Sequence, residues 1–280
     1  MNHVAIVASR SRPSVAEHAR NAAQWLHERS IAATVVATNE LDARSDDVRE
    51  ADLIVTLGGD GTILAASRFA APFGIPILGI HMGRFGFIAE AHPDVLIERL
   101  ADAIAGKADV EERTMVQGEV RRSGEAVHRA FGLNDIVISK GAMTRMLHLT
   151  IQFGDGPVMD CVADGVIVAT PTGSTAYALS AGGPIMDPTI RALLVVAICP
   201  HTLAARPVVV PDTQTVAVQV GTDGGEVKFS ADSASVFGLQ AGDEVHVRKY
   251  EHSVRLVTFG GGTFYDKVHD RLLWGERVNA

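Results

Sequence analysis

Short apolar runs alternate with helical patterns along the first third of the chain. Four runs are typical of buried strands: VAIVAS (4–9), ATVVAT (33–38), DLIVTL (52–57) and IPILGI (75–80). Ser14 and Glu17 have the spacing of a capping box, which predicts a helix that opens there and continues through Leu26. Further helices are predicted from near Thr62 and after Pro93. Strands separated by helices predict a parallel sheet covered by helices.

The pattern changes near residue 111. Segments 147–153, 215–220 and 244–250 alternate apolar and polar residues, as half-exposed antiparallel strands do. Helical periodicity is nearly absent after this point, apart from a short piece around Tyr177. We therefore predict an α/β domain with a Rossmann-like parallel sheet over residues 1–112. An all-β, sandwich-like domain is expected over 113–280, with the last residues as candidates to pack back on the first domain.

Composition and charge narrow the class of protein. Hydrophobic residues make up 47% of the 280 residues and charged residues 21%, an ordinary globular balance. The net charge of −8 leaves no general basic surface for nucleic acid or an anionic membrane. The apolar stretch 192–199 is too short to span a bilayer. Two cysteines, far apart and without a CxxC motif, suit a reducing cytoplasm.

The segment GGDGT (58–62) joins a predicted strand to a predicted helix, where open α/β sheets bind ligands. Gly58, Gly59, Gly61 and Thr62 would form a phosphate loop, since glycines let backbone N–H groups approach an anion closely. The segment has neither the Walker lysine nor the GxGxxG pattern. A plain turn, with Thr62 as the helix cap, is the alternative.

Asp60 adds a negative charge to this loop. A carboxylate among phosphates is unfavourable unless Mg²⁺ intervenes or a hydroxyl has to be held and deprotonated there. Both situations belong to phosphoryl-transfer chemistry, and GGDGT occurs in several kinase families.

Longer motifs distinguish among kinases. DGVIVATPTGSTAYALSAGGP (164–184) closely resembles the signature of the NAD kinase family, and PHTLAARP (200–207) resembles a second family motif. GRFGFIAE (83–90) and the pair Asn134–Asp135 follow the family's order. The resemblance implies transfer of the terminal phosphate of ATP, or of polyphosphate, to the 2′-hydroxyl of the adenosine ribose of NAD. It also implies Mg²⁺ bound with the phosphates, and a homodimer or homotetramer. A diacylglycerol-type lipid kinase, which shares GGDGT, and a non-catalytic NADP-binding sensor are the alternatives.

The same resemblance implies roles for individual residues. Asp60 would be the catalytic residue, with Gly61 against the dinucleotide; Asn134 and Asp135 would bind the adenosine. Asp164 would lie at the nicotinamide side. The segment around the adenine and ribose comprises Thr175, Ala176, Tyr177, Ala178, Leu179 and Ser180, and Arg145 contacts the dinucleotide in some members. Read without the family, Asn134–Asp135 is a turn, Tyr177 a half-buried packing residue and Arg145 a solvated strand-edge residue.

Other positions bear on metal and substrate. The eleven histidines show no HxxxH spacing, so no protein metal cluster is expected, and His201 receives no chemical role. The basic segment SRSRP (9–13) is read as a solvated loop that could touch an ATP phosphate. Many bacterial members carry a basic residue at the position of Val162, and some carry glutamine at the position of Ala234. Both differences remove polar groups from the dinucleotide side and leave the preference between NAD and NADH open.

Overall fold

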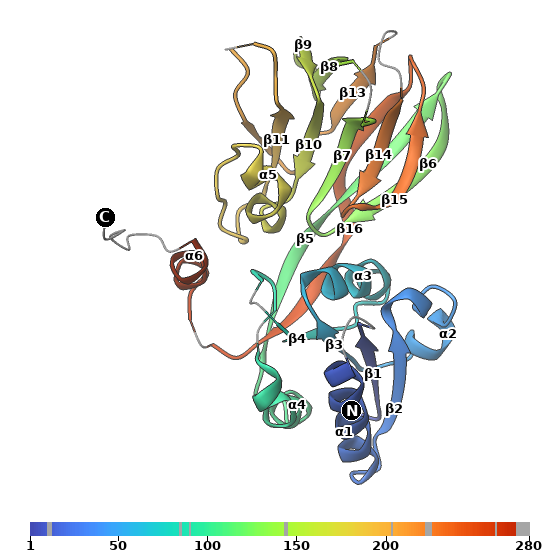
Figure 1. Cartoon of the computed structure of the whole chain (residues 1–280), viewed down its shortest axis with the longest axis vertical. Helices are drawn as coiled ribbons and strands as arrows, with labels where there is room; N and C mark the ends of the chain where they lie inside the picture. Colours follow the sequence, from blue (N-terminus) through green and yellow to red (C-terminus); the bar gives the residue numbers. More distant parts are fainter. Residues whose placement is uncertain are drawn as a thin grey trace. The chain divides into compact units, whose positions relative to one another are not determined.

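The computed structural model describes residues 1–9, 13–83, 86–89, 91–142, 145–202, 204–221, 226–260 and 262–272. The chain divides into two compact units (Figure 1). Unit 1 comprises Met1–Arg113 and His252–Ala280, and unit 2 comprises Thr114–Glu251. The chain therefore enters unit 2 once and then returns to unit 1.

Unit 1 contains a parallel sheet in the order β2-β1-β3-β4-β16. Its strands are β1 His3–Ala8, β2 Ala32–Ala37, β3 Leu53–Gly58, β4 Ile77–His81 and the end of β16 Glu244–Thr258. Every residue of β3 and of β4 is buried, as expected for central strands covered on both faces. The four strands predicted for this region are confirmed.

Helices cover both faces of this sheet. The helices of unit 1 are α1 Pro13–His27, α2 Ser45–Val48, α3 Asp60–Ala70, α4 Leu96–Ile104 and α6 Phe264–Leu272, with 3-10 turns η1 Thr38–Glu40, η2 Ala71–Phe73 and η3 Pro93–Val95. Leu26 of α1 and Leu100 of α4 are fully buried in one cluster with Ile6 of β1, and such burial contributes about 1.5–3 kcal/mol for each leucine. On the other face, Ile63 of α3 lies against Gly79 of β4, where a Cβ atom would come within 2.8 Å of the Ile63 Cδ1 atom.

The strand order reverses beside the carboxyl ends of β1 and β3. From β1, the chain continues to β2 on one side and later to β3 on the other, so the order reverses between β1 and β3. The backbone N–H of Ser9, just after β1, donates to the carbonyl of Leu57 in β3 at 2.9 Å. Open α/β sheets bind ligands at such a switch point, and Asp60 follows β3 there.

Unit 2 consists of antiparallel sheets. One has six strands in the order β12-β11-β10-β7-β14-β15; the other contains β13, β8 and β9 with β16, and β5 with β6 and β16. The strands are β5 Asp109–Arg122, β6 Glu125–Gly132, β7 Asp135–Lys140, β8 Leu147–Phe153, β9 Val158–Ala163, β10 Gly165–Ala169, β11 Ala192–Ile198, β12 Val208–Pro211, β13 Val216–Val220, β14 Val227–Ala231 and β15 Ala234–Leu239. A 3-10 turn η4 Thr172–Thr175 and the short helix α5 Tyr177–Ser180 follow β10.

The core of unit 2 lies between these sheets. Ile138, Val168 and Phe229 from the six-stranded sheet join Leu149 and Val247 from the other sheet in one buried cluster. The outer face of the six-stranded sheet forms a second cluster, which includes Ala178 of α5. The predicted fold class, an α/β domain followed by an all-β sandwich-like domain, is confirmed.

Three local predictions differ from the structure. Helix α1 begins at Pro13, so Ser14 lies inside the helix and is not its cap; proline is favoured at a first helical position because its missing N–H is not needed there. Helix α3 begins at Asp60 rather than near Thr62. Helix α6 was not expected, since the last residues give only a short amphipathic pattern that buries Val268.

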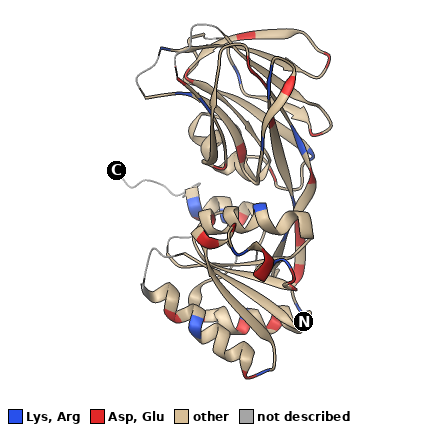
Figure 2. Cartoon of the chain, turned by 90° about the vertical axis from the view of Figure 1, so that its right-hand side faces the viewer, with Lys and Arg blue, Asp and Glu red and all other residues tan. Residues whose placement is uncertain are grey.

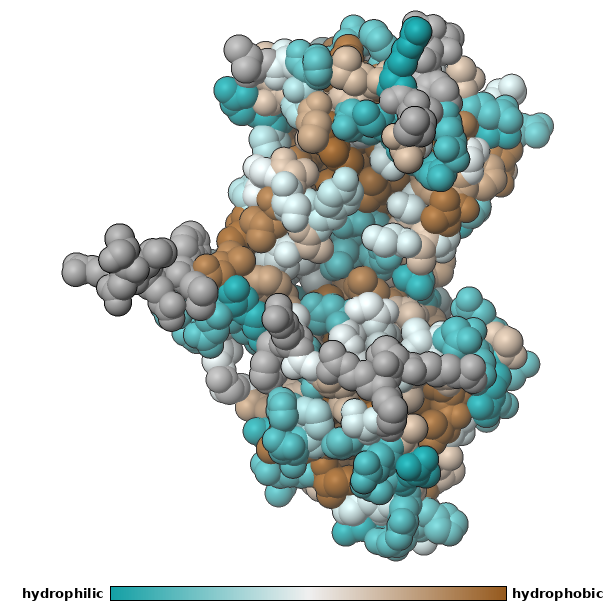
Figure 3. All heavy atoms as spheres, viewed as in Figure 1, coloured by the Kyte–Doolittle hydropathy of each residue, from teal (hydrophilic) through white to brown (hydrophobic). Residues whose placement is uncertain are grey.

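Charged and apolar residues are mixed over the molecule, as the ordinary globular composition predicts. Figure 2 shows Lys, Arg, Asp and Glu interspersed on the side that it presents. In the face drawn in Figure 3, apolar residues lie in patches interrupted by polar ones. Among the described residues, none of the helices is long and apolar enough to cross a membrane.

Candidate active site

Asp60 is the first residue of α3 and follows directly on β3 and Gly59. A carboxylate in the first turn of a helix is stabilised by the helix dipole. Its Oδ2 atom accepts a hydrogen bond from the backbone N–H of Phe87 at 3.0 Å. Its Oδ1 atom is buried and has no hydrogen-bond partner within the described chain. One oxygen is thus held by the protein, and the other can accept a proton or hydrogen bond from a ligand.

Gly86 makes room for this carboxylate. A Cβ atom at Gly86 would overlap both carboxylate oxygens of Asp60. Because the contact is with the functional end of Asp60, a larger residue here would have to displace the carboxylate. Gly86 lies in the segment 83–90 that was predicted to belong to the site, although Arg84, Phe85 and Glu90 fall outside the described residues.

His81 lies at the end of β4, opposite Gly58 in the strand register. Its side chain is buried, and its Nδ1 atom accepts the backbone N–H of Gly83 at 3.0 Å. Burial lowers the pKa of His81, and the negative charge of Asp60 opposes this shift. No sequence pattern indicates His81, because its place beside the loop depends on strand register.

The glycine loop is open on one side. Apart from neighbouring backbone, Cβ atoms added at Gly59 or Gly61 would meet no atom of the described residues within 4 Å, whereas one at Gly58 would overlap Thr62. Gly59 occupies the cap position of α3 without a side-chain capping bond, so Thr62 is not the cap. The cap that the plain-turn alternative assigned to Thr62 is therefore wrong. The loop combines free space with the amino end of an eleven-residue helix, which suits an anion.

In unit 2, Asn134 connects β6 to β7 and Asp135 begins β7. The carbonyl of Asn134 accepts the N–H of Thr170 at 2.8 Å, and a Cβ atom at Gly173 would overlap that carbonyl. The Asn134 Oδ1 atom is buried and has no partner within the described chain. As with Asp60, an unpaired buried acceptor suggests a ligand group.

Asp135 is only 4% exposed. Burial, and then the nearby charge of Asp232, raise the pKa of its carboxyl to about 7. Near neutral pH this group can therefore donate a hydrogen bond as the acid or accept one as the carboxylate.

The segment after β10 lies beside Asn134, because Thr170 and Gly173 contact it. Ala178 is fully buried, whereas Tyr177 is 44% exposed and Ser180 is also exposed. Thr175, Ala176 and Leu179 are half-buried, and the Thr175 hydroxyl donates to the carbonyl of Thr172 at 3.1 Å. Tyr177 thus lies at the surface rather than in a packing position.

Asp164 and Arg145 lie at the other end of unit 2. Strand β10 pairs antiparallel with β7, and its last residue, Ala169, lies opposite Asp135. Asp164 precedes the first residue of β10, five residues before Ala169, so it is about 17 Å from Asp135 along the strand. The Asp164 carboxylate forms an ion pair with Lys140 at 2.7 Å. Arg145 is exposed and precedes β8, which begins opposite the end of β9.

Comparison with known proteins identifies the family. The chain matches the ATP-NAD kinase N-terminal domain over residues 4–108 and the ATP-NAD kinase C-terminal domain over residues 133–259. The chain belongs to the ATP-NAD kinase family.

Similar proteins span nearly its whole length. The NAD kinase of Heliobacterium modesticaldum is 39% identical over 282 residues, covering 98% of this chain and 100% of that protein. The NAD kinase of Symbiobacterium thermophilum is 45% identical over 223 residues, covering 80% and 79%. The yeast NADH kinase, solved in complex with NADH, superposes with a TM-score of 0.88 at 25% identity, covering 100% of this chain and 90% of that one. The NAD kinase from Archaeoglobus fulgidus, solved in complex with ATP, gives a TM-score of 0.75 at 25% identity, with 96% and 97% covered.

NAD kinase chemistry raises the question of a metal ion. Among the described residues, no group of three or more His, Cys, Asp or Glu side chains could hold one. Mg²⁺, however, is usually bound through one or two carboxylates together with substrate phosphates. The open loop at the amino end of α3, which could hold such phosphates beside the Asp60 carboxylate, fits that arrangement.

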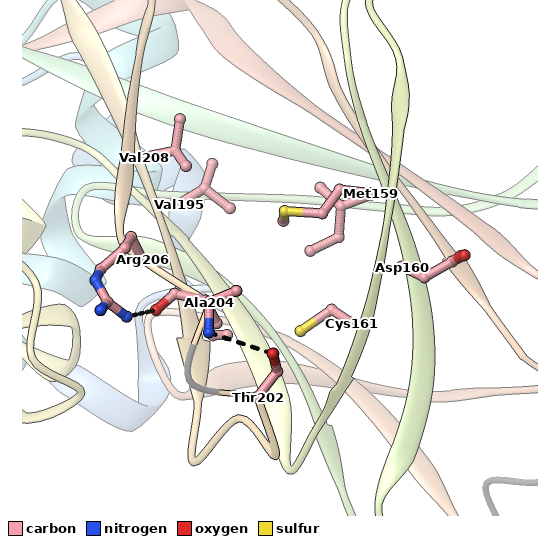
Figure 4. Close-up of a pocket in the computed structure, with 11 residues that line it drawn as sticks. Met159, Asp160, Cys161, Val195, Thr202, Ala204, Arg206 and Val208 are labelled. Carbon is pink, nitrogen blue, oxygen red and sulfur yellow. Dashed lines mark hydrogen bonds between the residues drawn. The ribbon is translucent and has the colours of Figure 1, made fainter.

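A pocket elsewhere in this NAD kinase is separate from the predicted residues. It lies beside β9 and β11 (Figure 4) and is lined mainly by apolar side chains, with Cys161 and Met159 among them. None of the site residues predicted from the sequence lines it. Burial raises the pKa of the Cys161 thiol, which disfavours the reactive thiolate.

Proposed function

We propose that this NAD kinase phosphorylates the 2′-hydroxyl of the adenosine ribose of NAD, with Asp60 as the general base. The observation that carries the proposal is the unequal state of the two Asp60 oxygens, one held by the Phe87 N–H and the other buried without a partner. The free oxygen takes the proton of the ribose hydroxyl. The hydroxyl oxygen then forms a bond to the γ-phosphorus of ATP, the bond from that phosphorus to the β–γ bridging oxygen breaks, and ADP leaves with the electron pair.

The glycine loop would hold the phosphates. Gly59 and Gly61 leave open space beside the amino end of α3, where backbone N–H groups and the helix dipole favour anions. Mg²⁺ supplies positive charge that reduces repulsion between Asp60 and the phosphates when it is bound. The ion would be held mainly by the phosphates in the glycine loop, so that the Asp60 oxygen that takes the proton stays free.

Asn134, Asp135 and the segment Thr175–Ser180 would bind the adenosine of NAD. The Asn134 Oδ1 atom can accept from an amino or hydroxyl group, and Asp135 can act as donor or acceptor near neutral pH. The exposed ring of Tyr177 offers an apolar face to a base. These groups are held to one another through Thr170 and Gly173.

Asp164 and Arg145 would act on the nicotinamide side. The distance of Asp164 from Asp135 along the strand suits an extended dinucleotide or a site completed by a second copy of the chain. We propose that the protein forms a homodimer or homotetramer in the cytoplasm. Light scattering of the purified protein at two or four times 29.7 kDa would support this assembly, and scattering at the monomer mass would contradict it.

A donor and acceptor assay tests the proposed reaction. The purified protein is incubated with NAD and Mg²⁺, with either ATP or polyphosphate, and NADP formation is followed. We expect NADP to form with ATP, the ligand of the archaeal relative. The reaction with polyphosphate shows whether polyphosphate is a second phosphate donor. Diacylglycerol in micelles replaces NAD in a parallel reaction. Phosphorylated lipid without NADP would favour the lipid kinase, and NADP binding without turnover would favour the sensor.

A further inference from the structure

Asp232 lies beside the proposed adenosine-binding residues but was not singled out by any motif. It follows β14 and, with Ser233, forms the two-residue turn to β15. Both residues have positive φ, 49° at Asp232 and 58° at Ser233. A two-residue hairpin with both residues in this region is a type I′ turn, and aspartate tolerates it better than most residues.

The Asp232 carboxylate binds the backbone of the connection between β6 and β7. It accepts hydrogen bonds from the N–H groups of Leu133 at 2.9 Å, Asn134 at 2.8 Å and Asp135 at 3.2 Å. The Asp232 N–H in turn donates to the Asp135 carbonyl at 3.0 Å. Three consecutive N–H groups that converge on one carboxylate stabilise its negative charge and fix the local backbone.

Gly132 completes this contact. A Cβ atom at Gly132 would lie 2.6 Å from one Asp232 carboxylate oxygen. Only glycine at this position lets the carboxylate reach the backbone of the connection between β6 and β7. The opposite side of Asn134 is held by Thr170 and Gly173, as described above. The backbone of Asn134 is therefore held from two sides, while its Oδ1 atom stays unpaired.

We propose that Asp232 is a positioning residue for NAD: its carboxylate holds the backbone of Leu133–Asp135 so that the side chains of Asn134 and Asp135 are presented to the adenosine. The inference rests on the proposed function, which assigns adenosine binding to these two residues. Asp232 itself need not touch the substrate.

Asp232 also sets the charge around Asp135. Strand β10 places Ala169 opposite Asp135, and β14 ends beside it with Ala231 and Asp232. Within the described chain, Asp232 is the charged group that acts on Asp135, and it adds to the effect of burial. Removal of the Asp232 charge should therefore lower the pKa of Asp135.

The test is steady-state kinetics of Asp232→Asn across pH. Asparagine tolerates positive φ and keeps one acceptor oxygen but removes the charge and the second oxygen. We expect the KM for NAD to rise roughly tenfold to hundredfold, because misplaced binding groups cost that order of magnitude. The KM for ATP should stay near the wild-type value. The pH dependence that Asp135 gives to kcat/KM for NAD should move to lower pH.

Two further variants keep the test decisive. Ser233→Asn changes the exposed neighbour in the same turn and should leave all these values unchanged. Gly132→Ala retains the aspartate but displaces its carboxylate, so it should raise the KM for NAD in the same direction even if Asp232→Asn does not fold. Wild-type kinetics in both Asp232→Asn and Gly132→Ala would overturn the inference. An equal loss for NAD and ATP with an unmoved pH dependence would also overturn it, in favour of a structural role. If the wild type makes no NADP, the proposed function fails instead.

Discussion

At the scale of single residues, the proposed catalysis depends on how the Asp60 carboxylate is held. A general base is effective when it is oriented and its acceptor oxygen is available. The Phe87 N–H orients Asp60, and the space left by Gly86 lets the carboxylate occupy this position. The chemistry therefore depends on a glycine 26 positions further along the chain as well as on the aspartate.

Gly86→Ala tests that dependence. The added methyl group overlaps the Asp60 carboxylate and should displace it, so we expect kcat to fall by about 10²-fold, the cost of a displacement near 1 Å. Gly238→Ala is the matched control, because its Cβ atom would meet nothing within 4 Å. Steady-state NADP formation measures both. An unchanged kcat in Gly86→Ala, with the fold intact by circular dichroism, would show that the carboxylate position does not limit catalysis.

Val162 addresses the choice between NAD and NADH. It is half-buried in β9 opposite His148, and its carbonyl accepts the N–H of His201 at 2.8 Å. Val162→Arg should change the ratio of activities on NAD and NADH, because a positive charge near the nicotinamide acts differently on its cationic and neutral forms. Val158→Arg, on the same strand at an exposed position, is the control. If the ratio of activities on NAD and NADH changes equally in both variants, or in neither, Val162 does not lie near the nicotinamide.

At the scale of elements, the connection between β6 and β7 has a backbone held by hydrogen bonds to the Asp232 carboxylate, and it leads into the buried carboxyl group of Asp135. Sequence reasoning without the family read Asn134–Asp135 as a turn, and the backbone is indeed a strand connection that leads into β7. The pattern could not indicate that a carboxylate 97 residues later would bind this connection. That contact follows from the pairing of β7 with β14, which is not encoded locally.

Asp135 makes stability depend on pH. The pKa of its carboxyl rises from 3.8 to about 7 on folding, so the folded protein binds more protons than the unfolded chain between these values. The free energy of unfolding should therefore fall as pH rises through this range, by roughly 2–4 kcal/mol from this group. Asp135→Asn should flatten that slope in urea titrations at pH 4, 5.5 and 7, whereas Asp155→Asn, at an exposed turn, should not. Parallel slopes for wild type and Asp135→Asn would contradict the assignment.

Buried strands were the elements that sequence predicted best. The runs that became β1, β3 and β4 are mostly apolar because the sheet is covered on both faces, and β8 was predicted with its observed bounds. Helix α6 was missed because only Val268 is buried on it. The start of α1 was wrong because a capping pattern is local, while Pro13 is itself an acceptable first residue of a helix.

At the scale of the whole molecule, β5 and β16 each contain residues of both units, so the chain passes into unit 2 along one strand and back along the other. The proposed base lies on unit 1, and the proposed adenosine-binding residues lie on unit 2. Sequence periodicity indicated the two types of sheet. The roles of Asp60, Asn134 and Asp135 came from the family resemblance, since spacing alone does not distinguish a base from a turn residue.

This division of roles leads to the most direct measurement, which compares NADP formation and NAD binding by the wild type and Asp60→Asn. Asparagine keeps the size of the side chain but cannot accept the proton, and general-base assistance is worth roughly 10²–10⁴ in rate. The account predicts that kcat falls by at least about 10²-fold while calorimetry still detects NAD binding, because the adenosine-binding groups are elsewhere in the chain. A kcat near the wild-type value in Asp60→Asn would contradict the account.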